Sequence, residues 1–470
     1  MSAITSLYRD TDAVGLARLV KRREVKAEEL LEAALARVSE TQPKFNYIVR
    51  LFPERAKALP PGEGPLAGVP FLVKDLAVDV AGEVTGMGSR SFHYTPSWNS
   101  VIVDRADAAG LVTFGKTTTP ELGLTITTES EATGLTRNPW DPTRIAGGSS
   151  GGAAVAVAVG AVPLAQASDG GGSIRVPASC CGLVGLKTSR GLIPHGPLKE
   201  TLWNGMSVTG PIARSVRDCA AFLDAMAGPS AGTRATPPLP EGGYLAALER
   251  APVGLKVALV DRSPIGGAIH PDVAAALEAA ARLLQGLGHP VEPAVPALDW
   301  AALMGANITN IAVSTASDIA EFARAWGRDP GEGLEPAVQN WRRMGLTRTA
   351  LEHEQALRSL EEGCMALDRF LQSYDIILSP TLAEPPVELG LLSLSNPDHQ
   401  QFVETYSRFC PFVGLANMTG TPAITLPLGQ SADGLPIGIM AQGRFGADLL
   451  LLQLAAQVEQ AAPWAGRRPG

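Results

Sequence analysis

The chain has 470 residues, of which 45% are hydrophobic and 18% are charged, so it can bury a large core. Its net charge of −8 and the absence of any basic run argue against nucleic acid or an anionic membrane surface as a partner. The length allows about three ordinary domains, but large α/β enzymes often form one unit.

Residues 10–40 carry apolar side chains at helical spacing and predict a pair of N-terminal helices. From about 65 to 215, segments rich in Val, Ile and Leu alternate with helical patterns, which is typical of a sheet covered on both faces. Within this region, residues 153–167 are nearly all apolar but are too short and too interrupted to cross a bilayer. They predict a buried helix followed by a core strand.

The second half of the chain begins with residues 225–245, which are rich in Pro, Gly, Ala and Thr and predict a surface linker. We then expect a strand at 255–260, a helix at 271–288, and strands at 375–380 and 422–428. Between them we expect helices over 300–370 and loops over 383–412.

A lysine ends an apolar strand-like run at residues 68–75 (GVPFLVKD), which would carry the Lys74 amine from the core edge into a pocket. Burial lowers a lysine pKa and yields a neutral amine that accepts a proton near neutral pH. The alternative is a strand-end lysine paired with Asp75. The serines described next favour the catalytic interpretation.

Two serines lie on glycine-rich backbone, in residues 147–152 (GGSSGG) and 168–177 (SDGGGSIRVP). A serine becomes a nucleophile when a neighbouring group accepts its proton, and unobstructed backbone N–H groups stabilise the oxyanion that forms. The pattern therefore indicates covalent acyl chemistry, with Ser149 and Ser173 as the candidate hydroxyls.

Other reactive residues give weaker signals. None of the six histidines lies in a motif beside an acid, and His195 lies in a Pro/Gly turn, so a Ser-His-Asp triad is unsupported. The five cysteines show no metal-ligand spacing. We expect the adjacent Cys180 and Cys181 to be buried thiols and not a redox pair.

These motifs resemble the amidase signature family of serine hydrolases. The matching segments follow the family order: 73–75 (VKD), 115–117 (GKT), 138–140 (NPW), 147–152 (GGSSGG), 169–177 (DGGGSIRVP), 181–187 (CGLVGLK), 210–216 (GPIARSV) and 434–438 (GLPIG). The resemblance implies one α/β/α sandwich domain over 1–470, with a large mixed β-sheet covered by helices on both faces. It also implies a catalytic core over 65–215 and a variable substrate-pocket region over about 300–412.

The resemblance further implies a Ser-cisSer-Lys triad. In this triad Ser173 is the nucleophile, Lys74 is the terminal base and Ser149 is the relay, with a cis Gly148–Ser149 peptide bond. Ser150 is expected to support Lys74 by hydrogen bonding. The expected oxyanion-hole donors are the N–H groups of Gly170, Gly171, Gly172 and Ser173.

Two residues flank the nucleophile loop, and we interpret Asp169 and Arg175 as an ion pair that holds its shape. Gly170 stands where the family has a larger residue, which predicts a wider or looser loop. Candidate substrate contacts, from their counterparts in the family, are Gly123, Leu124 and Trp203. Aromatic residues that could reach substrate from the variable region are Trp300, Phe322, Trp326, Trp341, Phe402, Tyr406, Phe409 and Phe412.

The predicted activity is hydrolysis of linear or cyclic amides through an acyl-enzyme, extending to carbamates (urethanes) and esters. The expected substrates are small and neutral, with hydrophobic or aryl groups, as in stand-alone bacterial amidases of the nylon-oligomer hydrolase and urethanase kind. The alternative is the glutaminase subunit of a tRNA-dependent amidotransferase, which shares the core but needs partner chains. An inactive binding scaffold is disfavoured because all three triad positions are filled.

No metal or organic cofactor is expected. The expected partner is a small-molecule amide or carbamate, and neither nucleic acid nor a membrane is expected as a partner. The sequence leaves open whether the chain forms a homodimer. Residues 1–10 lack a basic head followed by an apolar core, so we expect a reduced, cytoplasmic location.

Overall fold

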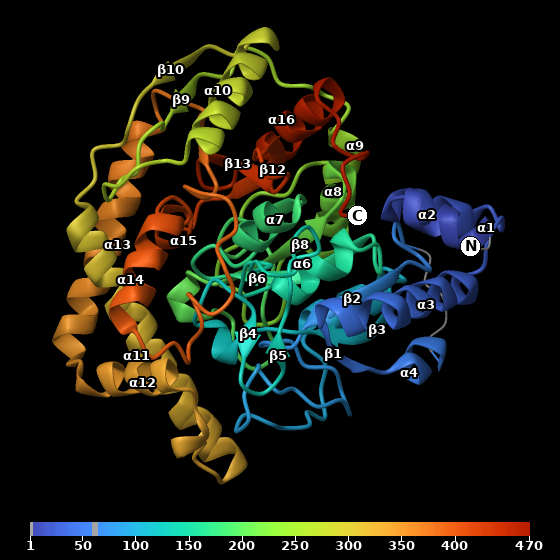
Figure 1. Cartoon of the computed structure of the whole chain (residues 1–470), viewed down its shortest axis with the longest axis horizontal. Helices are drawn as coiled ribbons and strands as arrows, with labels where there is room; N and C mark the ends of the chain where they lie inside the picture. Colours follow the sequence, from blue (N-terminus) through green and yellow to red (C-terminus); the bar gives the residue numbers. More distant parts are fainter. Residues whose placement is uncertain (1–2, 59–63) are drawn as a thin grey trace.

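An eight-stranded mixed β-sheet lies at the centre of the computed structural model, which describes residues 3–58 and 64–470 (Figure 1). The strand order is β10-β9-β11-β13-β12-β7-β8-β6. Strands β9, β10 and β11 pair in parallel, and the remaining pairs are antiparallel. The strands are β6 (Leu164–Asp169), β7 (Val184–Lys187), β8 (Val208–Ala213), β9 (Val257–Leu259), β10 (Val291–Pro293), β11 (Ile376–Pro380), β12 (Ala423–Gln430) and β13 (Pro436–Gly443).

A separate three-stranded sheet contains β1 (Ile48–Leu51), β3 (Val112–Thr117) and β2 (Pro70–Lys74). The expectation of one sheet over 65–215 is therefore wrong for β2 and β3. A side chain joins the two sheets at their junction, because Gln166 Oε1 of β6 accepts the N–H of Lys74 at 2.8 Å. A two-stranded hairpin of β4 (Glu129–Ser130) and β5 (Gly134–Leu135) lies apart from both sheets.

The N-terminal helices are α1 (Ala3–Asp10), α2 (Ala13–Lys21) and α3 (Ala27–Phe45). They confirm the predicted pair over 10–40 and add a helix before it. The Asp218 carboxylate holds the start of α2 by accepting the N–H groups of Ala13 and Val14 at 2.9 and 3.0 Å. This contact ties the N-terminal helices to α8 (Val216–Met226).

Two short buried helices follow the serine motifs directly. Helix α6 (Gly151–Ala158) begins after Ser150, and α7 (Arg175–Cys181) begins two residues after Ser173. Gly152 allows α6 to lie against the neighbouring chain, because a Cβ at this position would stand 2.5 Å from the backbone nitrogen of Thr118. Helix α6 and β6 confirm the predicted buried helix and core strand over 153–167.

The helices of residues 300–370 lie on the side of the molecule opposite α1–α3 (Figure 1). Helices α11 (Trp300–Trp326), α12 (Pro336–Thr347) and α13 (Ala350–Phe370) confirm the helical prediction over 300–370. The predicted loop over 383–412 is interrupted by α14 (His399–Phe409), whose first turn is capped by the Asp398 carboxylate. The remaining α-helices are α4 (Pro53–Ala58), α5 (Val101–Ala108), α9 (Tyr244–Ala247), α10 (Pro271–Gly286), α15 (Gly414–Thr419) and α16 (Asp448–Ala461).

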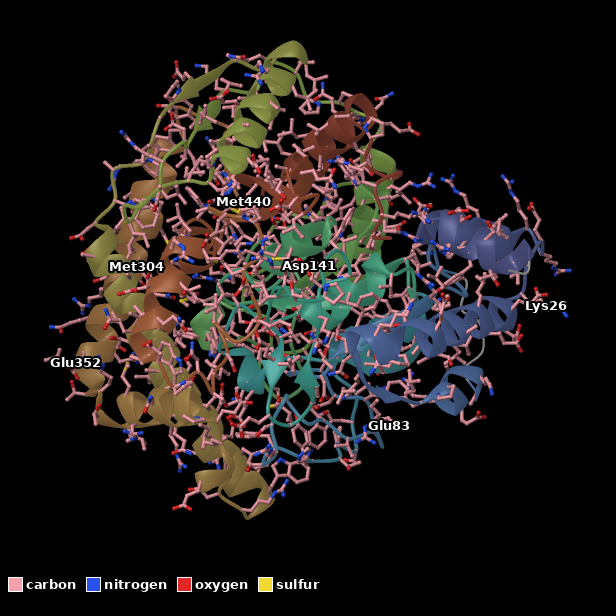
Figure 2. The ribbon with its side chains drawn as sticks, viewed as in Figure 1. Lys26, Glu83, Asp141, Met304, Glu352 and Met440 are labelled. Atoms are coloured by element: carbon pink, nitrogen blue, oxygen red, sulfur yellow. The ribbon has the colours of Figure 1, made fainter. Side chains whose placement is uncertain are left out.

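Most charged side chains lie at the surface and most apolar side chains lie inside. Lys26 and Glu352 are exposed at the outer edge, whereas Met440 of β13 lies inside (Figure 2). Cys180 and Cys181 are buried free thiols, as predicted. No described helix combines the length and apolarity that a bilayer crossing requires.

Candidate active site

Lys74 ends β2 with a completely buried side chain. Its Nζ lies 2.7 Å from Ser149 Oγ and 3.1 Å from Ser168 Oγ. Burial lowers the pKa of Lys74 to about 7, although the charge of Asp169 opposes this shift. The amine is therefore substantially neutral near neutral pH, which is the state that accepts a proton.

The alternative partner for Lys74 is engaged elsewhere. The Asp75 carboxylate pairs with Lys116 at 3.4 Å and accepts the N–H of Gly86 at 3.1 Å. Lys74 therefore does not form an ion pair with Asp75, and the alternative interpretation of this lysine is wrong.

The Gly148–Ser149 peptide bond is cis. Neighbouring chain segments approach closely at Gly123 and Gly148. A Cβ on Gly123 would stand 3.1 Å from Ser149 Oγ, and a Cβ on Gly148 would stand 2.1 Å from the Thr127 carbonyl oxygen. Glycine at both positions therefore lets two chain segments enclose the Ser149 hydroxyl.

Ser150 does not contact Lys74 as expected. Its hydroxyl donates to the Ser168 carbonyl at 3.2 Å and accepts the Ser168 N–H at 3.4 Å. The direct second hydroxyl on Lys74 comes instead from Ser168. Ser150 supports the lysine only by positioning β6, because its backbone turns it towards that strand.

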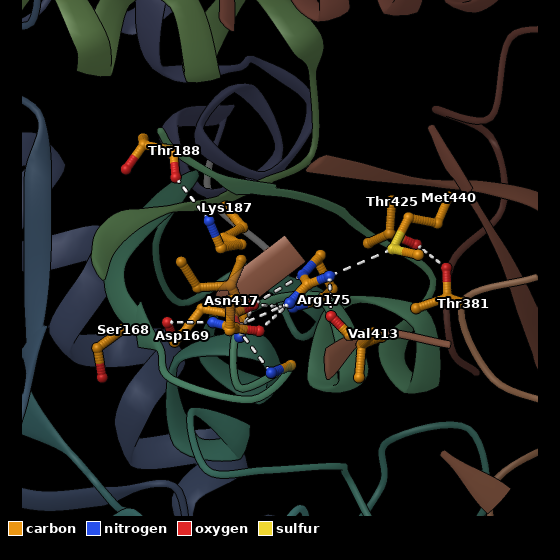
Figure 3. Close-up of polar contacts among 12 residues, drawn as sticks. Ser168, Asp169, Arg175, Lys187, Thr188, Thr381, Val413, Asn417, Thr425 and Met440 are labelled. Carbon is orange, nitrogen blue, oxygen red and sulfur yellow. Dashed lines mark hydrogen bonds and ion pairs between the residues drawn. The ribbon is translucent and has the colours of Figure 1, made fainter. Parts of the chain in front are cut away.

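Asp169 is the centre of the loop that carries Ser173 (Figure 3). Its Oδ1 accepts the N–H of Gly172 at 2.7 Å, and its Oδ2 accepts the N–H of Ile174 at 3.1 Å and Nε of Arg175 at 2.9 Å. Asn417 Nδ2 donates to both the carbonyl and Oδ1 of Asp169, at 2.8 and 2.9 Å. Since Ser173 lies between Gly172 and Ile174, one carboxylate holds the backbone on both sides of it.

The Asp169–Arg175 pair is completely buried. Burial alone would raise the pKa of Asp169, but Arg175, Lys187 and Asn417 lower it to well below its ordinary value. Arg175 also donates to the Val413 carbonyl at 2.8 Å, which links the loop to the chain just before α15. The pair thus has the structural position that the sequence predicts for it.

The expected oxyanion hole needs one correction. The N–H of Gly172 donates to Asp169 Oδ1, so this donor holds the loop and does not face a substrate carbonyl. The candidate donors that remain are the N–H groups of Gly170, Gly171 and Ser173. A Cβ on Gly171 would meet no atom within 4 Å, so that residue borders open space.

Gly170 does not leave the loop loose. A Cβ at this position would stand 2.8 Å from the Trp203 ring. The indole therefore occupies the space that a larger residue would take, and it packs directly on the loop.

A cavity of about 430 Å³ opens beside Ser149, Ser168 and Ser173. Gly123 and Trp203 line it, as predicted for substrate contacts. Leu124 is not among the lining residues and packs in an apolar cluster with Phe92 and Ile319. Leu122 lines the cavity in its place, because this residue has a left-handed backbone with φ of 50°.

The aromatic walls come from two parts of the chain. Among the aromatic residues predicted from 300–412, only Phe322 and Trp326 line the cavity, and both belong to α11. Phe92, Tyr94 and Trp98 form the other wall and were missed. The signal that could have found them is the aromatic-rich run 92–98 (FHYTPSW), which lies in a loop shortly after Lys74.

The described residues contain no group of three or more His, Cys, Asp and Glu side chains arranged to hold a metal ion. His195 lines the cavity, and its Nε2 lies 3.1 Å from the Ser207 carbonyl oxygen. Burial lowers the pKa of His195, so its ring is neutral. Among the residues that the structure describes, the basic group that hydrogen bonds to Ser149 is Lys74.

The amidase profile matches residues 29–452. The chain belongs to the amidase family. It is 37% identical to a 6-aminohexanoate-cyclic-dimer hydrolase of Pseudomonas sp. (strain NK87) over 97% of this chain and 96% of that protein. It is thus an amide-hydrolysing enzyme.

Solved structures agree with this assignment. The structure of a 6-aminohexanoate cyclic dimer hydrolase superimposes with a TM-score of 0.92 at 36% identity, covering 98% of this chain and 99% of that one. A bacterial aryl acylamidase of the amidase signature family superimposes with a TM-score of 0.86 at 25% identity, over 97% and 99% of the two chains. The predicted family and fold class are confirmed.

The lowered pKa of Lys74 predicts the pH dependence of the amidase. Because the neutral amine accepts the proton, kcat/KM should rise with pH through about 7 and level off above it. Lys74→Ala should remove this limb and reduce the rate by orders of magnitude. A pH profile with a neutral amide measures both effects, and near-wild-type activity with the same limb in Lys74→Ala would show that another group is the base.

Replacing Asp169 with Asn should affect stability and titration together. The change leaves Arg175 without a counter-charge in the interior, so the free energy of unfolding should fall by about 3–5 kcal/mol. It also removes the charge that raises the pKa of Lys74, so the limb of the pH profile should move to lower pH. Denaturant unfolding and a pH profile measure the two effects.

A matched control is Asp329→Asn, which breaks the ion pair with Arg342 at a carboxylate that is 53% exposed. It should change the free energy of unfolding by about 1 kcal/mol or less. Equal effects of the two substitutions would contradict the role of Asp169 in holding the loop.

Proposed function

We propose that the chain is a serine amidase that cleaves small hydrophobic or aryl amides through an acyl-enzyme. The observation that carries the proposal is the contact of 2.7 Å between the buried Lys74 amine and Ser149 Oγ, beside the cavity that Ser173 also lines. A buried lysine with a pKa of about 7 is suited to accept a proton from a hydroxyl at neutral pH.

In the proposed reaction, Ser173 Oγ attacks the amide carbonyl while its proton passes through Ser149 to Lys74. Backbone N–H groups of the loop stabilise the oxyanion. The lysine returns the proton along the same route to the leaving amine, which departs and leaves an ester on Ser173. Water, activated by the same groups, then cleaves the ester and restores the serine.

The cavity walls support hydrophobic and aryl substrates. Phe92, Tyr94, Trp98, Phe322 and Trp326 provide large apolar surfaces, and aromatic rings bind aryl groups with favourable offset or tilted contacts. The similar proteins named above act, by their names, on a cyclic amide and on aryl acylamides. Carbamates and esters present a carbonyl to the same hydroxyl, so we include them in the proposed range.

The competing proposal is a glutaminase subunit of an amidotransferase. Free glutamine would bring an α-carboxylate into the cavity, where Lys199 is the one lysine among the described lining residues. Lys199 is already engaged by Asp318 and Glu321, at 2.6 Å each. Efficient hydrolysis of free glutamine, without activity on neutral anilides, carbamates or alkyl amides, would overturn the stand-alone proposal.

The nucleophile is tested by covalent labelling. A fluorophosphonate probe should label wild-type protein stoichiometrically at Ser173, and Ser173→Ala should lose both labelling and turnover, by about 10⁴-fold or more. Circular dichroism checks that the variant remains folded. Stoichiometric labelling of Ser173→Ala at another serine would remove Ser173 from this role, and a wild-type protein that takes no label would favour an inactive scaffold.

The relay is tested by changing the leaving group. An amine must be protonated to leave, whereas an aryl alcohol leaves unaided, so Ser149→Ala should reduce amide hydrolysis more than aryl ester hydrolysis. The measurement is the ratio of kcat/KM for an anilide and an aryl ester of the same acyl group. An unchanged ratio would indicate that Ser149 carries no proton to the leaving group.

A further inference from the structure

The charged groups of the substrate cavity are unevenly balanced. Three carboxylates line it, from Asp79, Asp318 and Glu321, against the single ammonium of Lys199. His195 adds no charge, because burial lowers its pKa. The described wall of the cavity is therefore net negative, although most of its surface is apolar or aromatic.

The Lys199 ammonium forms ion pairs with both lining carboxylates of α11, those of Asp318 and Glu321. Lys199 Nζ lies 2.6 Å from Asp318 Oδ1 and 2.6 Å from Glu321 Oε2. These side chains are between 33% and 41% exposed and lie near Leu198 and Trp326, which are also partly exposed lining residues. The excess carboxylate thus lies where the cavity meets solvent.

Carboxylates also outnumber cations behind the loop of residues 92–98. The buried Asp79 carboxylate accepts hydrogen bonds from Tyr94 Oη at 2.8 Å, Trp98 Nε1 at 3.0 Å and Thr85 Oγ1 at 2.9 Å. These three donors are neutral. The cation behind them, Lys116, donates to Thr85 Oγ1 at 2.7 Å and pairs with Asp75 at 3.4 Å, so again one lysine serves two carboxylates.

Aromatic rings lie between the two acidic walls. Tyr94 and Trp326 have ring centroids 4.9 Å apart, and Phe92 and Phe322 have ring centroids 4.2 Å apart. In each pair one ring covers part of the other, so the pairs present apolar surface to the cavity. Arg328 lies over the Phe322 ring but is exposed and is not among the described lining residues.

We propose that this cavity selects substrates by charge, favouring amides that carry an ammonium group away from the scissile bond and rejecting those that carry a carboxylate. This inference rests on the proposed function and narrows its substrate class. Uncharged amides remain substrates, because the walls that receive them are apolar. An ammonium group is attracted by the excess carboxylate, whereas a carboxylate meets repulsion and finds Lys199 occupied.

The test uses anilides with linear acyl chains of equal length that end in methyl, ammonium or carboxylate. A second series carries the same three groups on the amine side, because the cavity receives both parts of the amide. In at least one series kcat/KM should be about fivefold or more higher for the ammonium than for the carboxylate member, the size of one partly exposed ion pair. A flat or reversed order in both series would overturn the proposal.

Charge variants locate the preference. The double variant Asp318→Asn, Glu321→Gln should reduce the ammonium-to-carboxylate ratio, and Lys199→Met should increase it, because it leaves two carboxylates without their cation. Glu278→Gln removes the same charge from an exposed pair on α10 and should leave the ratio unchanged. A ratio that responds equally to Glu278→Gln, or not at all to the double variant, would contradict this location.

Inhibition of the wild-type enzyme gives a measurement that needs no variant. An alkylammonium ion should compete with a neutral anilide more strongly than an alkyl carboxylate of equal length, and added salt should reduce this difference. Equal inhibition by the two ions would overturn the proposal. If the neutral anilides are themselves not hydrolysed, the proposed function fails; if they are hydrolysed without charge discrimination, only this inference fails.

Discussion

The arrangement of the active site depends on one buried carboxylate. A charge in the interior is costly unless it is paired and hydrogen bonded, so conformations in which Asp169 loses its donors are strongly disfavoured. Those donors come from the nucleophile loop, from Arg175 at the start of α7 and from Asn417 in α15. The loop, the helix that follows it and a helix remote in sequence are therefore held in one arrangement, with Ser173 between two N–H groups bound to the same carboxylate.

The same carboxylate sets the electrostatics around Lys74. The lysine is buried and donates to the hydroxyls of Ser149 and Ser168, and burial favours its neutral form. Asp169 acts in the opposite direction through its charge. The Asp169 carboxylate thus has two effects, one on the backbone geometry around Ser173 and one on the proton affinity of Lys74.

The gathering of Lys74, Ser149 and Ser173 at one place was predictable because its signals are local. Glycine-serine runs and a lysine at a strand end are contiguous in sequence, and the resemblance to a family supplied their pairing. The individual hydrogen bonds were not predictable from residue type: Ser168 takes the place expected for Ser150, and Asp169 accepts the N–H of Gly172 within its own loop. The residues that line the cavity were predicted least well. Which side chains reach the cavity depends on how α11 is turned and on the local backbone, such as the left-handed φ of Leu122, and neither can be inferred from residue type.

The cavity walls come from parts of the chain that are largely separate from the proposed catalytic groups. They come largely from the loop around residues 76–100, the segment around 195–207 and one face of α11, whereas Lys74, Ser149 and Ser173 belong to β2 and to the turns before α6 and α7. Substitutions on α11 can therefore alter which molecules enter without changing the segments that carry Lys74, Ser149 and Ser173. Directed evolution would best begin with libraries confined to α11, because the segment around 195–207 includes Trp203, which packs on the loop at Gly170.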